Sequence, residues 1–237
     1  MVADLLYEGK AKRVYQAQGK PNQVVLAYKN DATAFNGEKK AVFSGKGRLN
    51  NDISAHIFGV LNEQGIQTHF IEKLSETEQL VRQTKIIPLE VVVRNVAAGS
   101  ITKRLGIEAE TTFDPPMIEL FYKDDDLGDP LINDEHALFL SDVTESELTE
   151  IKAEALAINR HLSKLFAAVN IKIVDFKLEF GRLADRSIVL SDEISPDTCR
   201  LWDMKTYENL DKDVFRQGTG DLLEVYQKLL ERLEARS

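Results

Sequence analysis

Residues 171–202, IKIVDFKLEFGRLADRSIVLSDEISPDTCRLW, contain the pattern that decides the fold. Apolar residues alternate with charged ones near its start: Val174, Phe176, Leu178 and Phe180 against Asp175, Lys177 and Glu179. This period of two predicts a strand with one apolar face on a core and one charged face on a cleft. Residues 181–186 supply a turn, and the apolar, β-branched run 187–192 predicts a second strand. We therefore expect a hairpin that brings Asp192 close to Glu179.

Two carboxylates on paired strands repel each other unless a cation lies between them. Oxygen ligands that leave room for phosphate and water suit Mg²⁺, so this hairpin favours a magnesium-nucleotide site. The alternative is an edge hairpin whose charged face is simply solvated. The surroundings favour the site, because Lys177 lies between Asp175 and Glu179 and the polar loop 195–200, SPDTCR, follows soon after Asp192.

The composition is that of an ordinary globular protein of 237 residues, which suffices for one large domain or two small lobes. A formal net charge of -9 argues against general nucleic-acid binding, although local Lys and Arg clusters can still bind small anions. The single cysteine, Cys199, excludes an internal disulfide and fits a reducing compartment. The sequence shows no signal peptide and no apolar run of membrane-spanning length, so we expect a cytoplasmic protein without membrane contact.

Basic residues gather at a predicted turn in the first hairpin, residues 5–15, LLYEGKAKRVY. Such a turn can cover the phosphates of a nucleotide, although a solvated basic turn has the same sequence pattern. Residues 45–47, Gly-Lys-Gly, open an amphipathic helix that ends near Gly65, and they lack the spacing of a P-loop. Their amides could nonetheless receive an anion.

The near-continuous apolar run 85–94 predicts a strand buried on both faces, whose terminal Arg94 needs an anionic partner. Gly99 and Ser100 then cap a short helix that Gly106 ends, either as a phosphate site beside Arg94 or as a capped helix without ligand. Lys123 closes a later strand as a possible phosphate contact. The acids 124–126 that follow form either a metal cluster or a solvated loop. Residues 144–169 and 222–233 have the periodicity of amphipathic helices.

Seven ordered segments together resemble the SAICAR synthetase (phosphoribosylaminoimidazole-succinocarboxamide synthase) family over nearly the whole chain. They are GKAKRVY, NDATAF, GKG with NND, VVVRNVAAGS with TKRLG, VDFKLEFG, LSDEISPDTCRLWD and LDKDVFRQ. The resemblance implies a two-lobed α+β fold related to ATP-grasp and kinase-like folds, with antiparallel sheets and flanking helices. Residues 1–84 would cover the ATP phosphates, and residues 85–237 would hold the metal and ribonucleotide sites.

The same resemblance implies an ATP-dependent ligase of purine biosynthesis. It would join the carboxylate of carboxyaminoimidazole ribonucleotide (CAIR) to the amine of L-aspartate, with ATP and Mg²⁺. By position it implies five sets of residues: Lys10, Ala11, Lys12 and Lys123 on ATP; Glu179 and Asp192 on Mg²⁺; Arg94, Gly99, Ser100 and Arg200 on the ribonucleotide; Lys177 at the reacting carboxylate; and the segment from Asp31 to Asn36, with the loop of Asp197, around L-aspartate. Many relatives have an acid at the position of Asn36, which weakens a role for that side chain.

The chemistry requires activation of a carboxylate, and phosphorylation to an acyl phosphate supplies it. A base must also take a proton from the aspartate ammonium, and the sequence leaves Asp175 and Asp197 as candidates. A small-molecule kinase of related fold and a non-catalytic nucleotide-binding module are the rival interpretations. The resemblance further implies a homodimer or larger homo-oligomer.

Overall fold

The computed structural model describes residues 4–34 and 39–235. Over these residues the named strands form three antiparallel sheets. The first has the order β1 (Leu5–Glu8), β2 (Lys12–Gln16), β3 (Gln23–Tyr28), β7 (Glu78–Arg82) and β6 (Phe70–Lys73). The second has the order β10 (Leu131–Ile132), β9 (Thr112–Tyr122), β8 (Lys85–Val96), β11 (Ile171–Arg182) and β12 (Ile188–Ser191), with β13 (Cys199–Asp203) also paired to β11. The third pairs β4 (Asp31–Ala34) with β5 (Lys39–Val42).

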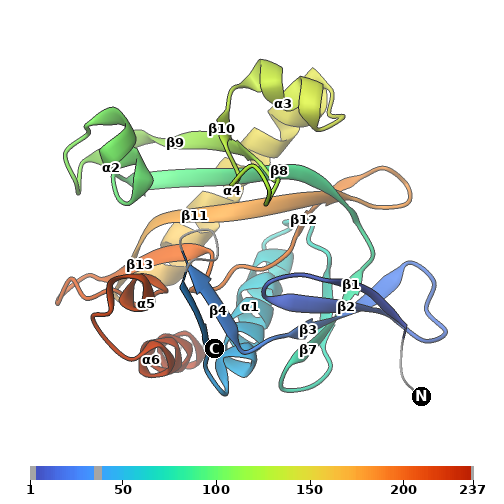
Figure 1. Cartoon of the computed structure of the whole chain (residues 1–237), viewed down its shortest axis with the longest axis horizontal. Coiled ribbons are helices and arrows are strands. Elements are labelled where there is room, and N and C mark those ends of the chain that lie inside the picture. The colour runs from blue at the N-terminus through green and yellow to red at the C-terminus, as the bar shows by residue number, and fades with distance from the viewer. Residues whose placement is uncertain (1–3, 35–38, 236–237) are drawn as a thin grey trace.

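Helices flank these sheets (Figure 1). They are α1 (Lys46–Glu63), α2 (Ser100–Leu105), α3 (Asp134–Leu140), α4 (Glu145–Ala167), α5 (Asp213–Gln217) and α6 (Leu222–Glu234). The long α4 packs against β11 and β8, and α1 contacts both β6 and α6. The predicted α+β class, with antiparallel sheets and flanking helices, is confirmed. Within the described ranges, no helix is both long and apolar enough to cross a bilayer.

The longest helix, α4, starts where its sequence provides a capping box. The Thr144 hydroxyl accepts from the backbone N–H of Glu147, and the Glu147 carboxylate accepts in turn from the backbone N–H of Thr144. Its buried residues, among them Leu148, Ile151 and Leu162, follow the helical period and join the main core.

The predicted hairpin of β11 and β12 is present, and it pairs Glu179 with Ser191, the neighbour of Asp192. Two details of the prediction were wrong. β11 continues through the predicted turn as far as Arg182. The pairing of β11 with β13 is also irregular between Ile173 and Asp175, and Val174 packs in a separate small cluster rather than with Phe176. A bulge explains this, because one extra residue shifts the alternation of faces.

Strand β8 is less enclosed than the prediction of a strand buried on both faces. Ile87, Leu89, Val91 and Val93 are all buried, whereas Glu90 and Val92 between them are only half-buried. Each of the latter two lines a hollow in the surface, and both hollows are described below. The central sheet thus has one face on the core and one face on a cleft.

The sheets divide near the predicted lobe boundary, since the five-stranded sheet ends at Arg82 and the six-stranded sheet begins at Lys85. Helix α1 belongs to the N-terminal segment but also contacts α6. The division into lobes 1–84 and 85–237 therefore stays a prediction.

Candidate functional site

A cleft of about 520 Å³ lies between the five-stranded sheet and β8, β11 and the loop after β12. Its apolar lining comes mainly from the five-stranded sheet, including Val14, Val24, Leu26 and Val81, and β8 adds Ile86. Its lining also includes eight of the residues predicted from the sequence, which are Ala11 and the charged residues Lys10, Lys12, Lys123, Lys177, Glu179, Asp192 and Asp197. An apolar slot beside a group of cations suits a ligand with a flat ring and phosphates.

The β1–β2 turn brings its lysines to two places at this cleft. Gly9 closes the turn by donating from its backbone N–H to the Lys12 carbonyl at 2.8 Å. The Lys12 ammonium is buried between Asp192 at 2.7 Å and Glu193 at 2.8 Å. Lys10 is half exposed and pairs with Asp125 at 2.7 Å. Lys12 therefore belongs to the floor of the cleft, whereas Lys10 lies at its rim.

Glu179 is the central carboxylate, with a side chain only 3% exposed. Its Oε1 accepts from Lys123 at 2.9 Å and from Lys177 at 3.0 Å. Burial disfavours the charge of Lys177, but Glu179, Glu90 and Asp192 outweigh it and raise the pKa of that lysine. Burial alone would raise the pKa of Asp192, but the nearby Lys12 and Lys177 ammonium groups outweigh this effect and lower the pKa. Asp192 therefore stays ionised beside these lysines.

Glu179 and Asp192 suit a magnesium ion, because both present carboxylate oxygens to the same cleft. In the described ranges no group of three or more His, Cys, Asp or Glu residues is placed to hold a metal. The protein would therefore supply two ligands, and phosphate oxygens and water the others. In the loop 124–126, Asp124 accepts from the backbone N–H groups of Asp126 and Leu127, so it caps its own turn.

A second hollow of about 240 Å³ adjoins the cleft and is rich in arginine. Arg94 is buried and donates to Glu119 and to Asp175, each at 2.6 Å, and lies 3.4 Å from the Ser100 hydroxyl. Arg200 donates to Asp175 at 2.9 Å and to Asp213 at 2.9 Å. These two guanidinium groups thus share Asp175, which holds them side by side as an anion site.

Gly99 and Ser100, at the start of α2, lie beside this pair of arginines. A Cβ added at Gly99 would lie 2.5 Å from Nη2 of Arg200. The predicted cap is correct, since Gly99 precedes α2 and Gly106 follows it. A larger residue at position 99 would therefore displace the Arg200 guanidinium, and the φ of 65° favours glycine there as well.

The cleft and the arginine-rich hollow share one stretch of wall, formed by Lys177, Asp197 and Thr198. A ligand in each would therefore bring their reacting ends together beside the Lys177 ammonium. This arrangement suits transfer of a charged group from one small molecule to another.

The two candidate bases are both held by cations. Asp197 accepts from the buried Lys46 ammonium, from Asn50 at 3.1 Å and from the Tyr226 hydroxyl at 2.6 Å. Burial would raise the pKa of Asp197, but Lys46 and Lys212 outweigh it and lower the pKa. Asp175 lies between Arg94 and Arg200. Cations therefore neighbour both candidate bases, and the role of each as a base stays a prediction.

Comparisons with known proteins agree over almost the entire chain. A family model described as SAICAR synthetase matches residues 5–233. The phosphoribosylaminoimidazole-succinocarboxamide synthase of Oceanobacillus iheyensis is 67% identical over 234 residues, which is 99% of both chains. The chain belongs to the SAICAR synthetase family.

Solved SAICAR synthetases have the same fold. The enzyme from Ehrlichia chaffeensis is 47% identical with a TM-score of 0.94, over 98% of this chain and 99% of that one. A SAICAR synthetase (Type-2) in complex with ADP is 48% identical with a TM-score of 0.92, over 96% of each chain. The family predicted from the sequence is therefore confirmed.

The segment predicted around L-aspartate in this SAICAR synthetase is placed only in part. Asp31 lies on β4 with its side chain 43% exposed, 3.7 Å from Lys29, and lines neither hollow. Thr33 of the same strand does line the cleft. Asn36 lies outside the described residues. The role of this segment stays a prediction.

Several residues of the site were missed from the sequence. They are Lys46, Glu90, Glu193, Lys212 and Arg216. Lys46, Lys212 and Arg216 stand inside segments that carried the family resemblance, GKG and LDKDVFRQ, which was the available signal. Cys199 lines the arginine-rich hollow, but burial raises the pKa of its thiol, which agrees with a structural role.

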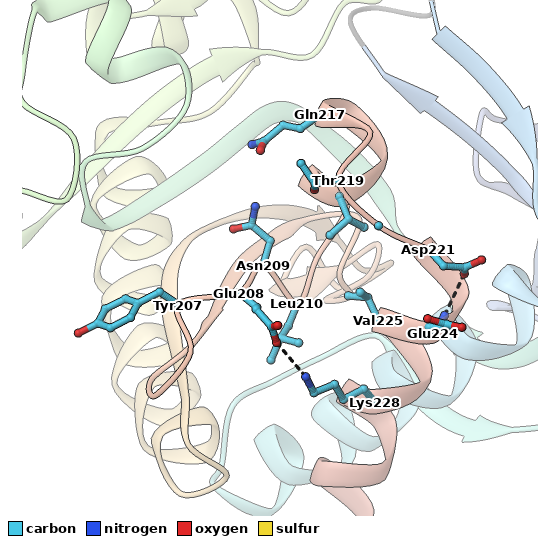
Figure 2. A pocket seen from close by; sticks show the side chains of 12 residues that line it. Tyr207, Glu208, Asn209, Leu210, Gln217, Thr219, Asp221, Glu224, Val225 and Lys228 are labelled. Atoms are coloured by element: carbon cyan, nitrogen blue, oxygen red, sulfur yellow. Dashed lines mark hydrogen bonds and ion pairs between the residues drawn. The ribbon is translucent and has the colours of Figure 1, made fainter.

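A further hollow of about 470 Å³ lies between the loop after β13 and α6 (Figure 2). Three of its charged side chains are already engaged, since Lys228 pairs with Glu208 and Asp221 caps α6. None of the predicted site residues lines it. Most of the predicted site residues lie instead at the cleft and the arginine-rich hollow.

Proposed function

We propose that this chain is an ATP-dependent ligase that joins the carboxylate of CAIR to the amine of L-aspartate, giving SAICAR, ADP and phosphate. One observation carries the proposal beyond family membership. The lysine-lined cleft and the arginine-rich hollow meet at Lys177 and Asp197, so a nucleotide and a phosphorylated ribonucleotide would react there. A protein that binds only ATP would have no use for the second hollow.

In the first step, a carboxylate oxygen of CAIR attacks the γ-phosphorus of ATP, and ADP leaves. Lys12, Lys123 and Lys177 offset the negative charge of the phosphates and keep the carboxylate in line. Mg²⁺ on Glu179 and Asp192 would supply further charge neutralisation when bound. Arg94, Ser100 and Arg200 hold the ribonucleotide phosphate.

In the second step, the aspartate nitrogen attacks the acyl carbon, and phosphate leaves with the oxygen that came from the carboxylate. The acyl phosphate must meet the amine before water does, so exclusion of solvent from the shared wall is required. Because Asp175 and Asp197 are held by cations, we propose that phosphate oxygens of the intermediate accept the ammonium proton.

Oxygen tracing tests this mechanism directly. CAIR labelled with ¹⁸O in its carboxylate, incubated with Mg-ATP and L-aspartate, should give phosphate that carries one ¹⁸O atom together with SAICAR, both identified by mass spectrometry. Unlabelled phosphate alongside SAICAR would exclude the acyl phosphate, and absence of SAICAR would exclude the ligase. We also expect a homodimer or larger homo-oligomer in the cytoplasm, and light scattering tests the assembly.

A further inference from the structure

One lysine of the cleft lacks a close partner. The Lys212 side chain is 11% exposed and lines the cleft. Its ammonium lies 3.9 Å from Oδ2 of Asp197, which is beyond hydrogen-bond distance, and among the described residues it donates to no side chain or carbonyl. The same Asp197 oxygen already accepts from Lys46 and Asn50. A buried ammonium without a close acceptor is costly unless an anion binds beside it.

The position of Lys212 is fixed by its backbone. Its N–H donates to the carbonyl of Pro196 at 3.1 Å, which ties it to the loop of Asp197. The neighbouring Asp211 carboxylate accepts from the backbone N–H groups of Leu201 and Asp213, each at 2.7 Å. Lys212 therefore starts from a rigid turn, unlike a freely moving surface lysine.

The other cations of the site all lie within hydrogen-bond distance of a carboxylate. Lys12, Lys123 and Lys177 pair with carboxylates along the cleft. Arg94 and Arg200 line the arginine-rich hollow. Lys212 instead lies beside Asp197, at the wall that both hollows share. There an incoming amine would meet the activated carboxylate.

We infer that Lys212 binds a carboxylate of L-aspartate and helps to select a dicarboxylic amino acid as the amine substrate. This inference rests on the proposed ligase function. Burial lowers the pKa of Lys212, and Asp197 only partly offsets this effect, so a carboxylate that arrived there would favour the charged ammonium. Thr33 of β4 lines the same cleft, and this strand belongs to the segment predicted around aspartate.

A comparison of the affinities for SAICAR and CAIR distinguishes a role of Lys212 in aspartate binding from a purely structural role. SAICAR carries the two carboxylates of the aspartate moiety and CAIR lacks them, so calorimetric titration of both ligands isolates that group. Lys212→Met should weaken SAICAR binding about 10- to 100-fold, the range expected for one charge-assisted hydrogen bond, with CAIR and ADP affinities unchanged. Lys212→Arg should recover part of the loss. In turnover, KM for L-aspartate should rise while KM for ATP stays constant.

The control is Lys228→Met, which removes an exposed lysine on α6 outside both hollows and should bind both ligands like wild type. Equal SAICAR affinity in Lys212→Met and wild type would overturn the inference. A selective loss of ADP or CAIR affinity would also overturn it and assign Lys212 to the phosphates. Wild-type protein that does not consume L-aspartate would contradict the ligase function itself, which is a separate outcome.

Discussion

Replacing Gly99 by alanine should damage ribonucleotide binding specifically. The new Cβ would lie 2.5 Å from Nη2, 2.6 Å from Cζ and 2.8 Å from Nη1 of Arg200, far inside normal contact distance. Arg200 cannot retreat without lengthening its bonds to Asp175 or Asp213. Loss of one charge-assisted hydrogen bond costs about 1.5–3 kcal/mol, so CAIR affinity should fall about 10- to 100-fold. Titration calorimetry with CAIR measures this loss.

The same substitution also strains the backbone, because Gly99 has φ 65° and ψ -130°, a region open almost only to glycine. Gly106→Ala is the matched control. It lies at the other end of α2 with φ 64°, and among the described residues an added Cβ would meet no atom within 4 Å apart from those of its chain neighbours. Both variants should lose about 1–3 kcal/mol of stability in urea unfolding, but only Gly99→Ala should lose CAIR affinity. Equal CAIR affinity in the two variants would refute this reasoning about Arg200.

Two further predictions concern stability. Asp197→Asn leaves the buried Lys46 without its carboxylate and should cost about 3–5 kcal/mol in urea unfolding, whereas Asp134→Asn, in an exposed pair with Lys152, should cost less than about 1 kcal/mol. Similar losses of stability in the two variants would contradict the conclusion that Asp197 and Lys46 form a buried ion pair. Hydrogen bonds from Arg182 and, to a lesser extent, from the Thr144 N–H lower the pKa of Glu147 from 4.5 to about 2. The ionised Glu147 therefore adds to the free energy of unfolding above pH 4.5, and this contribution is lost as the pH falls toward 2. Glu147→Gln should therefore be less stable than wild type by about 1 kcal/mol at pH 6, and the gap should close near pH 2.

The sequence was sufficient for the elements whose pattern is local. The period of two in β11, the helical periodicity of residues 144–169 and the glycines around α2 all act within a few turns or residues, and each predicted its element. The bulge at Val174 was missed, because two apolar neighbours, Ile173 and Val174, can be read in either phase until the partner strand is known.

The site was predictable where charges share a strand or a motif, and less so where partners are distant in sequence. Lys46 and Asp197 are 151 positions apart, and only the packing of α1 beside the loop 195–198 brings them together. Composition gave no indication that this lysine is buried. The lowered pKa of Asp197 also became clear only from its neighbours Lys46 and Lys212, because the sequence does not show which cations lie beside a carboxylate.

Release of ADP tests the central claim most directly. Purified wild type with Mg-ATP and CAIR should release ADP to completion only when L-aspartate is present, and the variant Glu179→Gln should lose at least about 100-fold in rate, because it weakens both the magnesium ligand and the partner of Lys177. Removal of Mg²⁺ with EDTA should stop the wild type in the same way. Release of ADP that is indifferent to L-aspartate, or a Glu179→Gln variant as active as wild type, would contradict the account.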